Sequence, residues 1–104
     1  MANDKILRLI KEQVYVFFPD CKVFLFGSRA RNENATDSDY DILIITKNDT
    51  PLALKRDLRT KIREALISFN ILSDILVESE QEILKKKQLT GHIVKSAIKE
   101  GVEI

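Results

Sequence analysis

The sequence predicts an α/β fold, in which a small mixed β-sheet is flanked by helices within a single domain of 104 residues. Short apolar runs of strand length alternate with longer stretches whose apolar residues recur at helical spacing, a pattern typical of helices packed on a sheet. Residues 42–45 are apolar at every position, so both faces of that strand are expected to be covered. No repeat, low-complexity tract or linker divides the chain. Strand order does not follow from this pattern.

An amphipathic helix is predicted at the start of the chain, over residues 4–18. Its apolar side chains recur at helical spacing, Asn3 or Asp4 can cap its first turn, and Pro19 ends the run. A strand is predicted next, over residues 21–26, because this run is rich in strand-forming residues and is followed by a glycine. This predicted helix and strand are the first two elements of the expected α/β fold.

A polar connection leads from the first strand to the second. Residues 28–31 are expected to form a brief helical turn, and residues 32–38 are polar and rich in turn formers. The second strand is predicted over residues 40–46. Its apolar run places it at the centre of the sheet, covered by helices on both sides.

A long helix is predicted over residues 51–69, with Pro51 near a permitted first position. Its apolar face is expected to contain Leu54, Leu58, Ile62, Ala65, Leu66 and Phe69. The basic side chains fall on the other face, namely Lys55, Arg56, Arg59, Lys61 and Arg63. A solvated surface is the favoured interpretation of these charges, and a surface that docks a partner is the alternative.

The last part of the chain is expected to contain a third strand and two helices. The strand covers residues 70–78. Ser79 and Glu82 have the spacing of a capping box, which predicts a short helix that the lysines of residues 85–87 close. A final helix is predicted over residues 90–98, with Gly101 placed to end it.

Charge and cysteine content limit the possible functions. The net charge of +1 gives no overall attraction to nucleic acid or to an anionic membrane, so direct nucleic-acid binding is not expected. Cys21 is the only cysteine, which excludes an intramolecular disulfide and favours a reducing cytosol. The N-terminus has no signal-peptide pattern and the chain has no long uncharged stretch, so we expect a cytoplasmic protein without membrane contact.

Candidate phosphate- and cation-binding residues lie where the first two predicted strands meet the polar connection. Gly27 lets the backbone approach a phosphate, and Ser28 can donate its N–H and its hydroxyl at the start of a helical turn. Asp39 and Asp41 are two residues apart on an extended chain, so their carboxylates should converge on one side and bind a cation. Asp74 stands among apolar neighbours, where a lone buried carboxylate is costly, which favours a functional role for it. The alternative is an aspartate at the edge or at a bulge of the sheet.

These residues resemble the signature of a known family. Gly27-Ser28, ten intervening residues and Asp39-Tyr40-Asp41 are similar to the motif of the minimal nucleotidyltransferases of the polymerase-beta-like superfamily, especially the MntA antitoxins. The resemblance covers nearly the whole chain, including the strand with Asp74 and the ending over residues 97–104. The family commonly has a glycine where this chain has Asn32, which can adopt a left-handed conformation at modest cost.

The resemblance implies an adenylyltransferase that uses ATP and two Mg²⁺ ions. Asp39 and Asp41 would bridge both ions, and Asp74 would complete the ion nearer the acceptor and take the proton of the attacking hydroxyl. Gly27 and Ser28 would hold the β- and γ-phosphates. The guanidinium groups of Arg29 and Arg31 would flank the triphosphate.

The resemblance also implies a partner. It predicts that another protein completes the acceptor site, and that this protein is a HEPN-domain ribonuclease toxin of the HepT type, silenced when its tyrosine is adenylylated. A hetero-oligomer with the toxin would follow, of a stoichiometry that the sequence leaves open. Two alternatives remain: a non-catalytic antitoxin that acts by complex formation, and the catalytic subunit of a split transferase for a small molecule such as an aminoglycoside.

Overall fold

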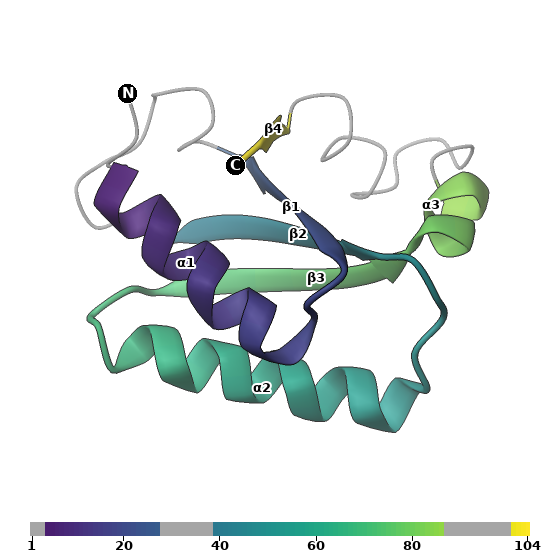
Figure 1. Cartoon of the computed structure of the whole chain (residues 1–104), viewed down its shortest axis with the longest axis horizontal. Coiled ribbons are helices and arrows are strands. Elements are labelled where there is room, and N and C mark those ends of the chain that lie inside the picture. Colours follow the sequence, from purple (N-terminus) through teal and green to yellow (C-terminus); the bar gives the residue numbers. More distant parts are fainter. Residues whose placement is uncertain (1–3, 28–38, 87–100) are drawn as a thin grey trace.

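The computed structural model describes residues 4–27, 39–86 and 101–104 (Figure 1). Helices and strands alternate in these residues, as the sequence predicts for an α/β protein. The elements are α1 (Asp4–Phe17), β1 (Cys21–Phe26), β2 (Tyr40–Thr46), α2 (Leu52–Ile67), β3 (Ser73–Ser79), α3 (Glu80–Lys86) and β4 (Val102–Glu103). The predicted helical turn over residues 28–31, the polar connection up to residue 38 and the last predicted helix lie outside the described residues.

The four strands form one mixed sheet in the order β3-β2-β1-β4. β1 runs antiparallel to both of its neighbours, β2 and β4, whereas β2 and β3 are parallel. α2 connects the parallel pair, so it ends at the same end of the sheet at which β2 and β3 begin (Figure 1). The predicted mixed sheet flanked by helices is therefore confirmed.

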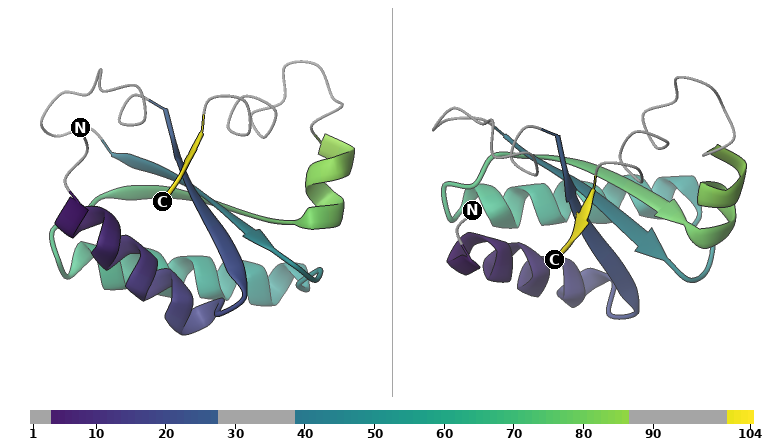
Figure 2. Two further views of the ribbon diagram at one scale, coloured as in Figure 1. Left: turned by 45° about the horizontal axis from the view of Figure 1, so that its top comes forward. Right: turned by 90° about the horizontal axis from the view of Figure 1, so that it is seen from above.

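The main hydrophobic core lies between the sheet and the helices α1 and α2, which cover the same face (Figure 2). Alternate residues of β2, Ile42 and Ile44, point into this core and are fully buried. Leu43 is also fully buried but belongs to a second, smaller core on the opposite face, to which α3 contributes Ile83. β2 is therefore covered on both faces, as its uniformly apolar sequence predicts.

The boundaries of α2 and β3 differ from the predicted ones. α2 ends at Ile67 instead of residue 69, and β3 begins at Ser73 instead of residue 70. Asn70 adopts a positive φ of 61°, which neither a helix nor a strand accommodates. The connection around Asn70 is closed by the Ile71 N–H, which donates to the Leu66 carbonyl oxygen at 3.0 Å.

Two residues assigned to the apolar face of α2 are not in the core. Leu54 and Phe69 are each 47% exposed, whereas Ile62 and Leu66 are fully buried. Phe69 lies beyond the last residue of the helix and so leaves its helical register. The part of α2 that faces the core is therefore shorter along the helix than the sequence pattern suggests.

The predicted capping box at the start of α3 is confirmed. The Ser79 N–H donates to Glu82 Oε1 at 2.9 Å, and the Glu82 N–H donates to Ser79 Oγ at 3.1 Å. Lys55 of α2 forms an ion pair with Glu82 at 3.0 Å, and Ser79 Oγ also donates to a carboxylate oxygen of Asp49. These contacts join α2 and α3 across the end of β3.

Lys86, at the end of α3, has a more specific role than the predicted complement to the helix dipole. Lys86 Nζ lies 2.7 Å from Oε1 of Glu78, a carboxylate that is 7% exposed. A buried carboxylate needs such a partner to offset the loss of its hydration. Among the described residues, no helix has the length and apolar character needed to span a membrane.

Candidate functional site

The candidate site begins at Gly27, directly after β1. Gly27 has a positive φ of 74°, a conformation that favours glycine over other residues. A Cβ atom at this position would lie only 2.1 Å from Oδ2 of Asp41. The sequence suggests that the glycine gives room to a phosphate, and the structure adds that the Asp41 carboxylate itself occupies the space beside the glycine.

Asp41 and Asp74 are aligned on neighbouring strands. The parallel register of β2 and β3 pairs their Cα atoms, and the antiparallel register of β1 and β2 pairs Asp41 with Phe26. Register-paired residues of adjacent strands project to the same face, with the strands about 4.8 Å apart. This face is the one opposite α1 and α2, because Leu43, two residues after Asp41, belongs to the smaller core.

The two carboxylates differ in accessibility. Asp41 is half-buried next to Gly27, whereas Asp74 is exposed on β3, which forms one edge of the sheet. The expectation that Asp74 is a buried carboxylate is therefore wrong, because an edge strand leaves its side chain open to solvent. A molecule approaching from outside the edge of the sheet therefore meets Asp74 first. The arrangement separates an inner carboxylate, enclosed by two neighbouring strands, from an outer one that is exposed at the edge of the sheet.

Tyr40 holds the two strands in this register, which sequence reasoning did not anticipate. Its N–H donates to the carbonyl oxygen of Leu72 at 2.9 Å, and its side chain is buried in the main core. Because side chains alternate along a strand, an aromatic residue between two aspartates turns to the core while they turn away from it. The sequence contains the signal for this arrangement, namely the aromatic Tyr40 between the charged Asp39 and Asp41.

Asp39 is the last residue before β2 and is exposed. Its position two residues before Asp41 places it on the same side of the extended chain. Within the described ranges, no three acidic, histidine or cysteine side chains are gathered closely enough to hold a metal ion. The structure thus brings Asp41 and Asp74 together by register, and the three-carboxylate metal centre stays a prediction.

The donor atoms available at this site suit magnesium. Carboxylate oxygens are the ligands that Mg²⁺ prefers, and it is commonly held by one or two protein carboxylates together with substrate phosphates. Asp41 and Asp74 supply such oxygens on one face. Ser28, Arg29 and Arg31, the predicted phosphate-binding residues, lie outside the described residues.

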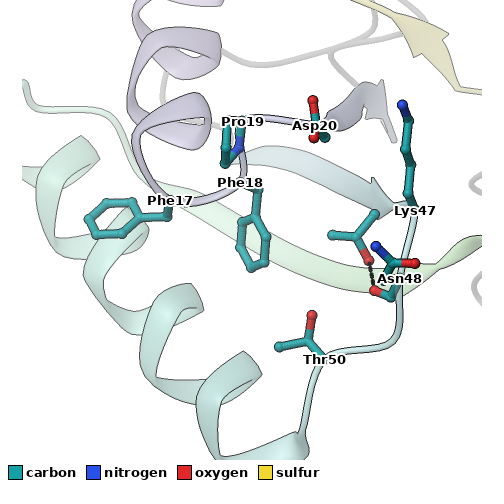
Figure 3. Close-up of a pocket in the computed structure, with 8 residues that line it drawn as sticks. Phe17, Phe18, Pro19, Asp20, Lys47, Asn48 and Thr50 are labelled. Atoms are coloured by element: carbon teal, nitrogen blue, oxygen red, sulfur yellow. Dashed lines mark hydrogen bonds between the residues drawn. The ribbon is translucent and has the colours of Figure 1, made fainter.

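A small cavity of about 190 Å³ lies at the opposite end of the strands (Figure 3). It lies between the end of α1 and the end of β2, where the Thr46 hydroxyl donates to the carbonyl oxygen of Asn48 at 2.9 Å. Its lining residues are Phe17, Phe18, Pro19, Asp20, Thr46, Lys47, Asn48 and Thr50. The cavity is smaller than typical ligand pockets of about 300 to 1,000 Å³, and it is remote from Asp41 and Asp74.

Comparison with known structures identifies several with a similar fold. A nucleotidyltransferase from Sulfolobus solfataricus has a TM-score of 0.53 and 26% identity, over 95% of this chain and 76% of that one. A toxin–antitoxin complex with AMP-PNP has a TM-score of 0.56 and 18% identity, over 99% of this chain and 72% of the other. A MntA–HpeT toxin–antitoxin complex has a TM-score of 0.52 and 18% identity, over 100% of this chain and 71% of the other. At 18% identity, the similarity to the two complexes shows a shared fold alone.

Sequence comparison identifies the family. A protein of Methanocaldococcus jannaschii that carries the name of a protein adenylyltransferase is 35% identical over 80 residues, which cover 77% of this chain and 73% of the relative. The family model described as a nucleotidyltransferase domain matches residues 4–104. The predicted resemblance is confirmed, and this chain belongs to the nucleotidyltransferase domain family.

Proposed function

We propose that this nucleotidyltransferase uses Mg²⁺ to transfer AMP from ATP to a hydroxyl of a partner protein, and that the partner is a HEPN ribonuclease toxin which adenylylation silences. The observation that carries the proposal is the register of Asp41 with Asp74, which aligns two carboxylates on one face of the sheet. Family membership supports the reaction class.

Asp39, Asp41 and Asp74 would hold the metal. Their oxygen donors match the ligand preference of Mg²⁺, and the alignment of Asp41 with Asp74 across adjacent strands is consistent with a shared site. When bound, the metal supplies positive charge that offsets the negative charge developing on the transferred phosphate. The predicted number of ions is two.

The transfer step uses the difference between the inner and outer carboxylates. The acceptor hydroxyl oxygen attacks the α-phosphorus of ATP, the bond from that phosphorus to the bridging oxygen of pyrophosphate breaks, and pyrophosphate leaves. The Asp74 carboxylate, exposed at the sheet edge, takes the hydroxyl proton. Gly27 and Ser28 bind the β- and γ-phosphates, and the side chains of Arg29 and Arg31 flank the triphosphate.

A protein acceptor is supported by the comparisons. The Methanocaldococcus jannaschii relative is named for the adenylylation of proteins. Two of the similar folds come from toxin–antitoxin complexes, and one of these was crystallised with AMP-PNP. These relationships favour a toxin partner over a small-molecule acceptor.

The proposal is tested by incubating the protein with its cognate HEPN toxin, Mg²⁺ and ATP labelled at the α-phosphate. We expect label on a toxin tyrosine, with none after chelation of the metal by EDTA. Replacing the toxin with an aminoglycoside separates the small-molecule alternative, because label would then appear on the antibiotic.

The non-catalytic alternative is separated by a second assay in cells that express the toxin. A variant with Asp39, Asp41 and Asp74 all replaced by alanine should fail to protect these cells. Full protection by a folded triple variant would show that complex formation alone neutralises the toxin, and would contradict the proposed mechanism.

A further inference from the structure

Three arginines line one edge of α2. Arg56, Arg59 and Arg63 are spaced three and four residues apart, so they lie within one stripe along the helix. Arg56 and Arg63 are exposed and Arg59 is half-buried. In the described part of the chain, none of the three guanidinium groups has a carboxylate within ion-pair distance.

The lysines of the same helix are paired. Lys55 contacts Glu82 at 3.0 Å and Lys61 contacts Asp57 at 3.1 Å. Lys61 lies roughly half a turn around the helix from Arg59 and Arg63, at 3.6 residues per turn. The cations of α2 whose charge is not matched within the described residues are therefore gathered on a single edge.

Exposed apolar side chains continue this stripe toward the candidate site. Ile67 is four residues after Arg63 on the same edge and is 48% exposed. Leu72 follows in the connection to β3 and is 55% exposed. Leu72 is two residues before Asp74, so the stripe ends beside the outer carboxylate of the site. We call Arg56, Arg59, Arg63, Ile67 and Leu72 the arginine edge.

We propose that the arginine edge docks the protein that supplies the acceptor hydroxyl, through an acidic amphipathic helix of that partner. This inference rests on the proposed function in taking the acceptor to be a protein. The unmatched arginines complement acidic side chains, and the exposed apolar residues next to them complement an apolar stripe. From Arg56 to Ile67 the edge spans about 16 Å at 1.5 Å per residue, which suits a partner helix of about three turns.

A protein fits this edge better than a nucleic acid does. Single-stranded nucleic acid is held by basic grooves with aromatic side chains on which bases stack, and the arginine edge as defined contains no aromatic residue. Ile67 and Leu72 offer aliphatic surface instead, which contributes to protein interfaces. The net charge of +1 supplies no general attraction to a polyanion.

The test measures the affinity of the protein for its cognate HEPN toxin without nucleotide, so that no transfer occurs. Two pairs of variants are matched in chemistry. Arg63→Glu on the edge is compared with Lys61→Glu on the opposite side of the helix, and Ile67→Ser is compared with Leu54→Ser, whose native side chain is about equally exposed. Thermal unfolding establishes that each variant is folded, and a 20-nucleotide single-stranded RNA serves as the alternative probe.

We expect Arg63→Glu and Ile67→Ser to weaken toxin binding about tenfold or more, and the two controls to change it less than about twofold. The proposal would be overturned if the two variants of each pair changed toxin binding equally, or if the protein did not bind the toxin. It would also be overturned if the protein bound the RNA in place of the toxin and this binding depended on the arginines. Binding that depends on the edge but is followed by no adenylate transfer on adding ATP would leave the docking intact and contradict the proposed function. Adenylate transfer to the toxin at a rate unchanged by the edge variants would support the proposed function and contradict docking at the arginine edge.

Discussion

The Asp41 carboxylate occupies the space that a side chain at position 27 would fill. Oδ2 of Asp41 lies 2.1 Å from where a Cβ atom of Gly27 would be, and Gly27 has a positive φ. The end of β1 therefore both turns the chain and leaves room for the inner carboxylate of the site. Two features of the family motif, the glycine and the second aspartate, are thus joined by a direct steric relationship.

Replacing Gly27 by alanine should impair both stability and activity. The positive φ alone costs a residue with a Cβ about 1 to 2 kcal/mol, and Asp41 must also move away from the new methyl group. We expect lower stability in urea denaturation and a large loss of nucleotidyl transfer. Thr60→Ala, at an exposed position within α2, is the control, and equal effects of the two substitutions would contradict the steric account.

The Glu82 carboxylate should stabilise the protein at neutral pH and lose this effect in acid. Burial alone would raise the pKa of Glu82, but hydrogen bonds from the Ser79 N–H and Lys55, and the nearby charges of Lys55 and Lys86, lower it below the ordinary value of 4.5. A carboxyl group with a lowered pKa stabilises the folded state above its unfolded pKa, and this contribution is lost as pH falls through the folded value.

The substitution Glu82→Gln isolates the charge, because glutamine can still accept the hydrogen bond of the capping box. We expect a decrease in stability on the order of 1 kcal/mol at pH 7, from urea denaturation. The difference from the unmodified protein should shrink below about pH 4. A difference that stayed constant between pH 7 and pH 3 would show that the ion pair with Lys55 does not contribute as described.

Cys21 should be a poor nucleophile in the folded protein. Burial raises the pKa of its thiol to about 11, and the nearby Asp20 acts in the same direction, although a backbone hydrogen bond partly opposes them. The thiolate, which is the reactive form, is then scarce at pH 8. Alkylation by iodoacetamide at pH 8 should be slow in the native protein and fast in urea, and fast labelling of the native protein would be inconsistent with the raised pKa of the half-buried thiol.

The sequence predicted the two strands at the centre of the fold with their observed bounds. β1 is a run of strand formers that Gly27 ends, and β2 is an apolar run that starts after a polar connection, so both are delimited by strong local signals. The capping box at Ser79 and Glu82 was also predictable, because its two hydrogen bonds connect residues only three positions apart.

Features that depend on tertiary contacts were not predictable in this way. The end of α2 follows from the left-handed conformation of Asn70, which the apolar spacing does not reveal. β4 has two residues and forms only by pairing with β1, so no local pattern marks it. The helical spacing that places Leu54 on the apolar face does not show that the core ends before it.

The candidate site was partly accessible from the sequence. Alternation along a strand places Asp39 and Asp41 on one side. The expected cost of burying a lone carboxylate singled out Asp74, but Asp74 is exposed on the edge strand β3, so that argument was wrong although the residue lies at the site. The register that aligns Asp74 with Asp41 could not be derived, since it depends on the strand order and on the bond from Tyr40 to the Leu72 carbonyl. The steric reason for Gly27 required the coordinates of Asp41.

The central claim is that Asp41 and Asp74 act together in nucleotidyl transfer. The most direct measurement is the rate of adenylate transfer from labelled ATP to the cognate toxin by Asp41→Asn and Asp74→Asn, with Asp20→Asn as a control at the opposite end of the strands. We predict that each site variant remains folded and loses at least about a hundredfold in rate, and that the control retains its activity. Transfer at an unchanged rate by either folded site variant would contradict the account.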